Sequence, residues 1–148
     1  MAFIDLLEKD VIKVPLESTE KNGILKELID VLKKAGKISE TEEVYKALRA
    51  REDQCSTGLE EGVAVPHAKT SAVQKLTLAL GIAPDGVDYE ALDGKPSKVF
   101  FMMLAPPDQS GPHIQALSEI ARMTQSASLM RLLVSSRTPE EILELFTE

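Results

Sequence analysis

Two histidines and one arginine are the residues of this chain that best suit the transfer of a charged group. His67 follows a short apolar segment that ends in a proline, and a residue just past a strand end stands at the rim of a sheet. His113 lies in the first turn of a predicted helix, where free N–H groups and the helix dipole attract anions and keep the imidazole neutral. Arg51 ends another predicted helix, and its fork of donors suits phosphate oxygens.

Each of these residues also has an ordinary structural explanation. A lone histidine such as His67 often caps a loop, and a polar residue such as His113 is common at a helix start. Arg51 would complement the dipole at a helix C-terminus, and Arg49 is a competing candidate only two residues away. No one of them alone establishes a site.

Hydroxyl side chains follow Arg51 in the sequence Cys55-Ser56-Thr57-Gly58. Ser56 and Thr57 could hold oxygens of a bound group with their hydroxyls and backbone amides, although Ser, Thr and Gly are also expected in any turn.

The single cysteine, Cys55, suggests a thiolate cradle that forms a phosphocysteine. Glu60 and Glu61 follow it and would raise the pKa of the thiol, which favours a buried or partly buried structural cysteine instead.

Composition excludes several classes of protein. The formal net charge of −7, with no basic stripe, argues against binding nucleic acid. The two histidines lack the close-spaced partners of a metal site, and no Gly-x-Ser-x-Gly elbow indicates a serine hydrolase. One cysteine and an amino terminus without a basic start and long apolar core favour a cytoplasmic protein.

Hydrophobic periodicity predicts an α/β fold, a single domain over residues 1–148 in which helices flank a mixed sheet of four to five strands. The predicted strands are 11–16, 55–58 paired with 63–65 as a hairpin, 76–82 and 99–104, with turns at Asp85-Gly86 and Asp93-Gly94. The predicted helices are 24–34, one from the capping box Ser39-Glu40-Thr41-Glu42 to about Arg51, 113–124, 129–134, and one from the capping box Thr138-Pro139-Glu140-Glu141 through Phe146.

Taken together, these residues resemble the EIIA component of the bacterial phosphoenolpyruvate-dependent sugar phosphotransferase system, of the fructose, mannitol and nitrogen-regulatory type (EIIA type 2). The resemblance lies in Arg51-Glu52, Ser56-Thr57-Gly58, Gly62-Val63-Ala64-Val65-Pro66-His67, and His113 with Leu117 four residues on. The family often carries Gly where this chain has Cys55 and Glu60.

The resemblance implies an α/β/α sandwich and a role for each residue. His67 is the implied phosphoryl-accepting nucleophile, Arg51 neutralises phosphoryl charge, and His113 hydrogen-bonds near the phosphoryl group. Ser56 and Thr57 are weaker candidates for supporting contacts. Neither a cofactor nor a metal is implied.

The resemblance also implies partners. Phospho-HPr is the expected donor and an EIIB component, on a separate polypeptide, the expected acceptor, with the membrane component EIIC involved only indirectly. The alternative is a nitrogen-type regulator whose phosphorylation state controls binding to other proteins. A third possibility, a binding module that keeps the fold without the chemistry, is disfavoured because Arg51, His67 and His113 occur together.

Overall fold

Five strands form one mixed sheet in the part of the chain that the structure describes. The computed structural model describes residues 6–59 and 62–146, so Glu60 and Glu61 lie outside it. The sheet has the order β1-β4-β5-β2, with β3 also paired to β5, and only the pair β4–β5 is antiparallel. The strands are β1 (Ile12–Lys13), β2 (Val63–Ala64), β3 (His67–Lys69), β4 (Thr77–Val87) and β5 (Ser97–Ala105).

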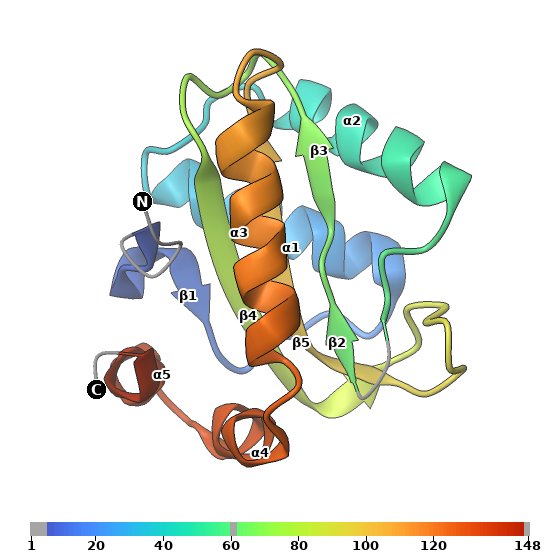
Figure 1. Ribbon diagram of the computed structural model, residues 1–148, viewed down its shortest axis with the longest axis vertical. Helices are drawn as coiled ribbons and strands as arrows, with labels where there is room; N and C mark the ends of the chain where they lie inside the picture. Colours follow the sequence, from blue (N-terminus) through green and yellow to red (C-terminus); the bar gives the residue numbers. More distant parts are fainter. Residues whose placement is uncertain (1–5, 60–61, 147–148) are drawn as a thin grey trace.

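Helices cover both faces of this sheet, with α3 in front and α1 behind in Figure 1. One face is packed by α1 and α2, and the other by α3, α4 and α5. The helices of the described residues are α1 (Lys21–Lys34), α2 (Thr41–Gln54), α3 (Ser110–Met123), α4 (Ala127–Ser135) and α5 (Pro139–Phe146), and a 3-10 turn at Lys9–Val11 precedes β1. None of these helices is both long and apolar enough to cross a membrane.

The central strand β5 shows why the core has two halves. Phe100 and Met102 pack among the residues of α1 and α2, whereas Phe101 and Met103 pack among those of α3, α4 and α5. Successive side chains of a strand point to opposite faces, so a continuous apolar run produces a strand covered on both sides. The predicted α/β class, with a mixed sheet flanked by helices, is confirmed.

The ends of several strands differ from the prediction. β4 extends to Val87 and includes Asp85-Gly86, which was wrongly predicted as a turn. The pairing register with β5 shifts between Ile82 and Val87, and Gly86 has φ +83. The glycine therefore allows an irregularity inside the strand. The predicted strand 11–16 is reduced to β1 and a further hydrogen bond from the N–H of Leu16 to the carbonyl of Ile82 (2.7 Å).

The two predicted capping boxes have different outcomes. At α5, the Thr138 hydroxyl accepts the N–H of Glu141 (3.1 Å), as predicted. At α2, the N-cap residue is Glu40 and no side chain caps the helix, so the box predicted at Ser39 is wrong. A side-chain cap needs the hydroxyl at the N-cap position itself, and the chain enters α2 one residue later than the pattern indicates.

Candidate functional site

His67 is the first residue of the short edge strand β3, not a residue beyond the end of a strand as predicted. It pairs with Met103 of β5, and the carbonyl of the preceding Pro66 accepts the N–H of Met103 (2.8 Å). A proline lacks an N–H but keeps its carbonyl, so Pro66 interrupts the pairing only as a donor. The strand therefore resumes at His67, on one margin of the sheet.

One nitrogen of the His67 ring is held by the backbone. Nδ1 lies 2.7 Å from the carbonyl oxygen of Val65. A carbonyl can only accept, so Nδ1 carries the proton and the neutral ring keeps its lone pair on Nε2. Burial is the main cause that lowers the pKa of His67, and the nearby Arg51 charge lowers it further, against the opposing effects of the Val65 bond and Glu52. The partly buried ring is consequently neutral near pH 7.

His113 lies beside His67 although 45 residues separate them in the chain. The two ring centroids are 5.5 Å apart with an interplanar angle of 69°. His113 is only 4% exposed, and its Nε2 has no hydrogen-bond partner among the residues that the structure describes. Burial lowers the pKa of His113, and repulsion from Lys69 and from the protonated form of His67 lowers it further. A neutral His113 was predicted from the helix dipole, whereas burial is the main cause of its lowered pKa.

The start of α3 also differs from the prediction. The helix begins at Ser110, so His113 already donates its N–H to the carbonyl of Gln109 (3.3 Å). The free amides of the first turn are therefore those before His113, and Pro112 lies in that turn without the loss of a hydrogen bond.

Arg51 lies in the last turn of α2, close enough for its charge to affect His67. Its charge contributes to the lowered pKa of His67, and Nη1 donates to the carbonyl of Cys55 (2.8 Å). The competing candidate, Arg49, pairs instead with Asp53 through Nη2 and Oδ1 (2.6 Å). The structure thus brings Arg51, His67 and His113 together and leaves Arg49 in an exposed ion pair.

Residues 55–59, which we call the site loop, connect α2 towards β2. The predicted hairpin is reduced here to a single antiparallel bridge between Gly58 and Ala64. Thr57 is buried and its hydroxyl donates to Glu52, while Ser56 Oγ donates to the carbonyl of Tyr89 (2.9 Å). Both hydroxyls are therefore engaged as donors within the protein.

Cys55 does not occupy the position expected of it. It is the C-cap residue of α2 with extended backbone, and its side chain is exposed. The prediction of a buried or partly buried cysteine is wrong because the loop turns Thr57, two residues later, into the interior.

Two residues near the histidines were missed as members of the site. Lys69 lies two residues after His67 on β3, hence on the same side of the strand, and its Nζ donates to Ser110 Oγ at the start of α3 (2.7 Å). Glu52 was quoted as part of the motif but was given no role, although it is a buried carboxylate (5% exposed). If His67 had been assigned to a strand, the alternation of side chains would have indicated that Lys69 lies on the same side. No sequence signal predicts that Glu52 is buried.

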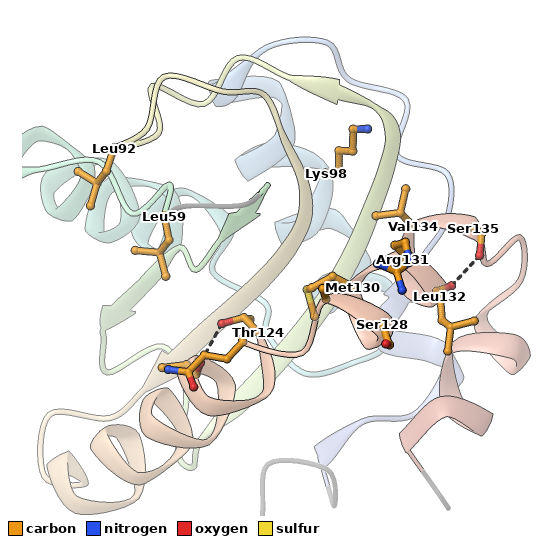
Figure 2. A pocket seen from close by; sticks show the side chains of 13 residues that line it. Leu59, Leu92, Lys98, Thr124, Ser128, Met130, Arg131, Leu132, Val134 and Ser135 are labelled. Carbon is orange, nitrogen blue, oxygen red and sulfur yellow. Dashed lines mark hydrogen bonds between the residues drawn. The ribbon is translucent and has the colours of Figure 1, made fainter.

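An open groove lies elsewhere on the protein. Figure 2 shows this open groove of about 1400 Å³, which is bordered by α4, the end of α3 near Thr124, Lys98 and the apolar side chains of Leu59 and Leu92. None of its lining residues is Arg51, His67 or His113. The candidate site lies instead at β3, on the edge of the sheet.

Comparison with known proteins matches nearly the whole chain to one family. Residues 5–148 match the family described as "Phosphoenolpyruvate-dependent sugar phosphotransferase system, EIIA 2". The chain is 36% identical over its full length to the fructose-specific EIIABC component of Bacillus subtilis (strain 168), of which it spans 23%.

Solved structures show the same fold. The nitrogen regulatory protein IIA-Ntr from Neisseria meningitidis is 30% identical, with a TM-score of 0.89 over 98% of this chain and 99% of that one. The mannitol enzyme IIA of Escherichia coli, solved with phosphorylated enzyme IIB, is 24% identical, with a TM-score of 0.79 over 94% of this chain and 95% of that one. The chain belongs to the EIIA 2 family of the phosphoenolpyruvate-dependent sugar phosphotransferase system.

Proposed function

We propose that this protein is a phosphocarrier in which Nε2 of His67 accepts a phosphoryl group and hands it on. The observation that carries this proposal is the bond between Nδ1 of His67 and the Val65 carbonyl, which leaves the Nε2 lone pair as the nucleophile. A lowered pKa keeps that lone pair unprotonated near neutral pH. The ring is thus ready to attack without the help of a separate base.

The transfer is balanced within the two histidine side chains that exchange the group. The P–N bond of the phosphohistidine in HPr breaks as a P–Nε2 bond forms on His67; the donor ring, protonated on its other nitrogen, leaves as a neutral imidazole, and His67 keeps its own proton on Nδ1, hydrogen-bonded to the Val65 carbonyl. The transition state of phosphoryl transfer is loose, so the protein mainly positions the group and neutralises its charge. Arg51 supplies a positive charge for the phosphoryl oxygens at one side of the ring.

His113 completes the proposed surroundings of the phosphoryl group. Its Nε2 is buried without a partner, and such a group carries a desolvation cost of about 1–3 kcal/mol. A hydrogen bond to the phosphoryl group on His67 would relieve that cost in the phosphorylated protein. Ser56 and Thr57, whose hydroxyls are engaged, shape the loop beside the group.

The proposed partners follow from the chemistry of the site and from the relatives. A site at the edge of a sheet is open to another protein, as transfer between proteins requires. We place phospho-HPr before this chain and an EIIB component after it, in the cytoplasm, and the complex of mannitol IIA with phosphorylated IIB supports the second step. Sugar uptake is the proposed outcome, in line with the fructose-specific relative.

A regulatory role is the second candidate, and the likeness to IIA-Ntr favours it. The chemistry at His67 is common to both roles, and the fate of the phosphoryl group separates them. A carrier passes it quickly to an EIIB, whereas a regulator retains it and changes its affinity for another protein.

The test is a phosphotransfer assay with phosphoenolpyruvate, enzyme I, HPr and purified EIIB proteins. We expect one acid-labile, base-stable phosphoryl group per chain, no labelling of His67→Ala, and rapid loss of the label to an EIIB. An acid-stable adduct, or full labelling of His67→Ala, would refute the proposal. Stable labelling without transfer to any EIIB would favour the regulatory role.

A further inference from the structure

Glu52 is a buried carboxylate that gathers four contacts next to the site. Its oxygens accept the N–H of Thr57 (3.0 Å), the hydroxyl of Thr57 and the hydroxyl of Tyr89 (3.1 Å). Lys21 Nζ lies 3.0 Å from Oε1, and the Lys21 side chain is itself only 11% exposed. These contacts pair the charge and satisfy both oxygens, which burial of a carboxylate requires.

Lys21 extends this arrangement to the neighbouring loops. Its Nζ also lies 3.2 Å from Glu90 Oε1, 3.5 Å from Ser56 Oγ and 4.7 Å from the centre of the Tyr89 ring. The carboxylate of Glu52 and the ammonium group of Lys21 therefore hold the site loop in place.

A continuous series of hydrogen bonds connects Glu52 with the His67 ring. Glu52 holds Thr57, and the carbonyl of Thr57 accepts the N–H of Val65 (3.0 Å). The carbonyl of Val65 in turn accepts the proton on Nδ1 of His67 (2.7 Å). Each bond fixes the position of the next group, and the last one decides which ring nitrogen is left bare.

We propose that Glu52 is a positioning residue for phosphoryl transfer, which acts through Thr57 and Val65 to hold His67 with its proton on Nδ1. This inference rests on the proposed function. Glu52 does not touch the phosphoryl group, because its oxygens face Thr57, Tyr89 and Lys21. Its neighbour Arg51 donates to the Cys55 carbonyl, so two consecutive residues of α2 hold the site loop at Cys55 and at Thr57.

The test variant is Glu52→Gln, which keeps the shape of the side chain and removes its charge. The readouts are the ¹⁵N chemical shifts of the His67 ring, which report the tautomer, and the rate of phosphoryl transfer from HPr. We expect the pure Nδ1–H tautomer in the wild type and a mixture in Glu52→Gln. Substitution of a residue that orients a metal-bound histidine typically lowers activity about 10–100-fold. We expect a loss of this size in the transfer rate of Glu52→Gln.

Glu27→Gln is the matched control. Glu27 also accepts two backbone N–H groups, those of Glu17 and Ser18, and pairs with Lys13 at 3.0 Å. None of these hydrogen bonds leads to His67. This variant should lose stability but keep the tautomer and the transfer rate. Thr57→Val, which removes only the hydroxyl bond to Glu52, should show a smaller change in the same direction and decides the matter if Glu52→Gln does not fold.

The outcomes separate this inference from the proposed function. A folded Glu52→Gln with wild-type tautomer and transfer rate would overturn the positioning role while the carrier function stands. If Glu52→Gln does not fold, an unchanged tautomer in Thr57→Val would overturn it. If the wild-type chain accepts no phosphoryl group, the proposed function fails, and the ring tautomer alone still decides whether Glu52 positions His67.

Discussion

At the scale of single residues, the site depends on keeping an imidazole neutral beside a permanent positive charge. Burial and Arg51 both lower the pKa of His67, and burial and neighbouring charges lower that of His113. A neutral ring can attack, and it does not repel the guanidinium beside it. The charge balance of the site changes only when a phosphoryl group arrives, and Arg51 is then the nearest compensating charge of α2.

Arg51→Gln should therefore have two effects. Removal of the positive charge should raise the pKa of His67, because the protonated ring is no longer repelled. Loss of one donor to a developing phosphoryl charge typically costs about 100-fold in rate, and we expect a loss of that order. An NMR titration of the ring and a transfer assay measure the two effects.

Arg49→Gln is the control for that variant, because it removes a charge from the same helix and only breaks the exposed pair with Asp53. It should leave both the titration and the rate unchanged. Equal effects of the two substitutions would show that Arg51 acts only through the net charge of the protein.

At the scale of elements, three short segments bring the site residues together. Pro66 separates β2 from β3 and lets His67 re-enter the sheet, the site loop brings the end of α2 towards β2, and the start of α3 places His113 over β3.

The two capping patterns, at the starts of α2 and α5, lie away from these segments and can be tested without phosphoryl transfer. Thr138→Ala removes the hydroxyl that accepts the Glu141 N–H and should lower the free energy of unfolding by about 1 kcal/mol. Ser39→Ala should change it by less than about 0.5 kcal/mol, because the side chain of Ser39 does not cap α2. Urea unfolding of the two variants measures this difference, and equal losses would contradict the assignment of the caps.

These elements also show what could be predicted from the sequence. Apolar periodicity predicted α1 and a continuous apolar run predicted β5, because burial on one or two faces leaves a direct record in residue type, whereas α5 was predicted from the capping box at Thr138. It could not reveal the irregularity at Gly86, since a glycine inside a bulge and a glycine in a turn look alike. Residue type and position singled out His67, His113 and Arg51, and the resemblance supplied their roles, whereas Glu52 was missed because its partners, Lys21 and Tyr89, are remote in the chain.

At the scale of the whole molecule, the lowered pKa values of both histidines couple the site to stability. In the pH range just below about 6.5, both histidines bind protons in the unfolded chain but not in the folded protein. The free energy of unfolding should therefore fall as the pH decreases through that range, by about 1.4 kcal/mol for each unit by which a pKa is lowered. The lowered pKa of Glu27 acts in a separate range, because its contribution is lost only as the pH falls below about 4.5.

His113→Gln should flatten this dependence. Urea unfolding at pH 7.5 and pH 5.5 measures the loss of stability in each protein, and the variant should lose less than the wild type. An identical loss in both proteins would mean that His113 titrates equally in the folded and unfolded states.

The central claim is that Nε2 of His67 carries the phosphoryl group, and its direct test is NMR of the ¹⁵N-labelled, phosphorylated protein. Coupling between ³¹P and ¹⁵N identifies the bonded nitrogen, and the account predicts that coupling at Nε2 of His67, with the proton still on Nδ1. Coupling at Nδ1, or at His113, would contradict it.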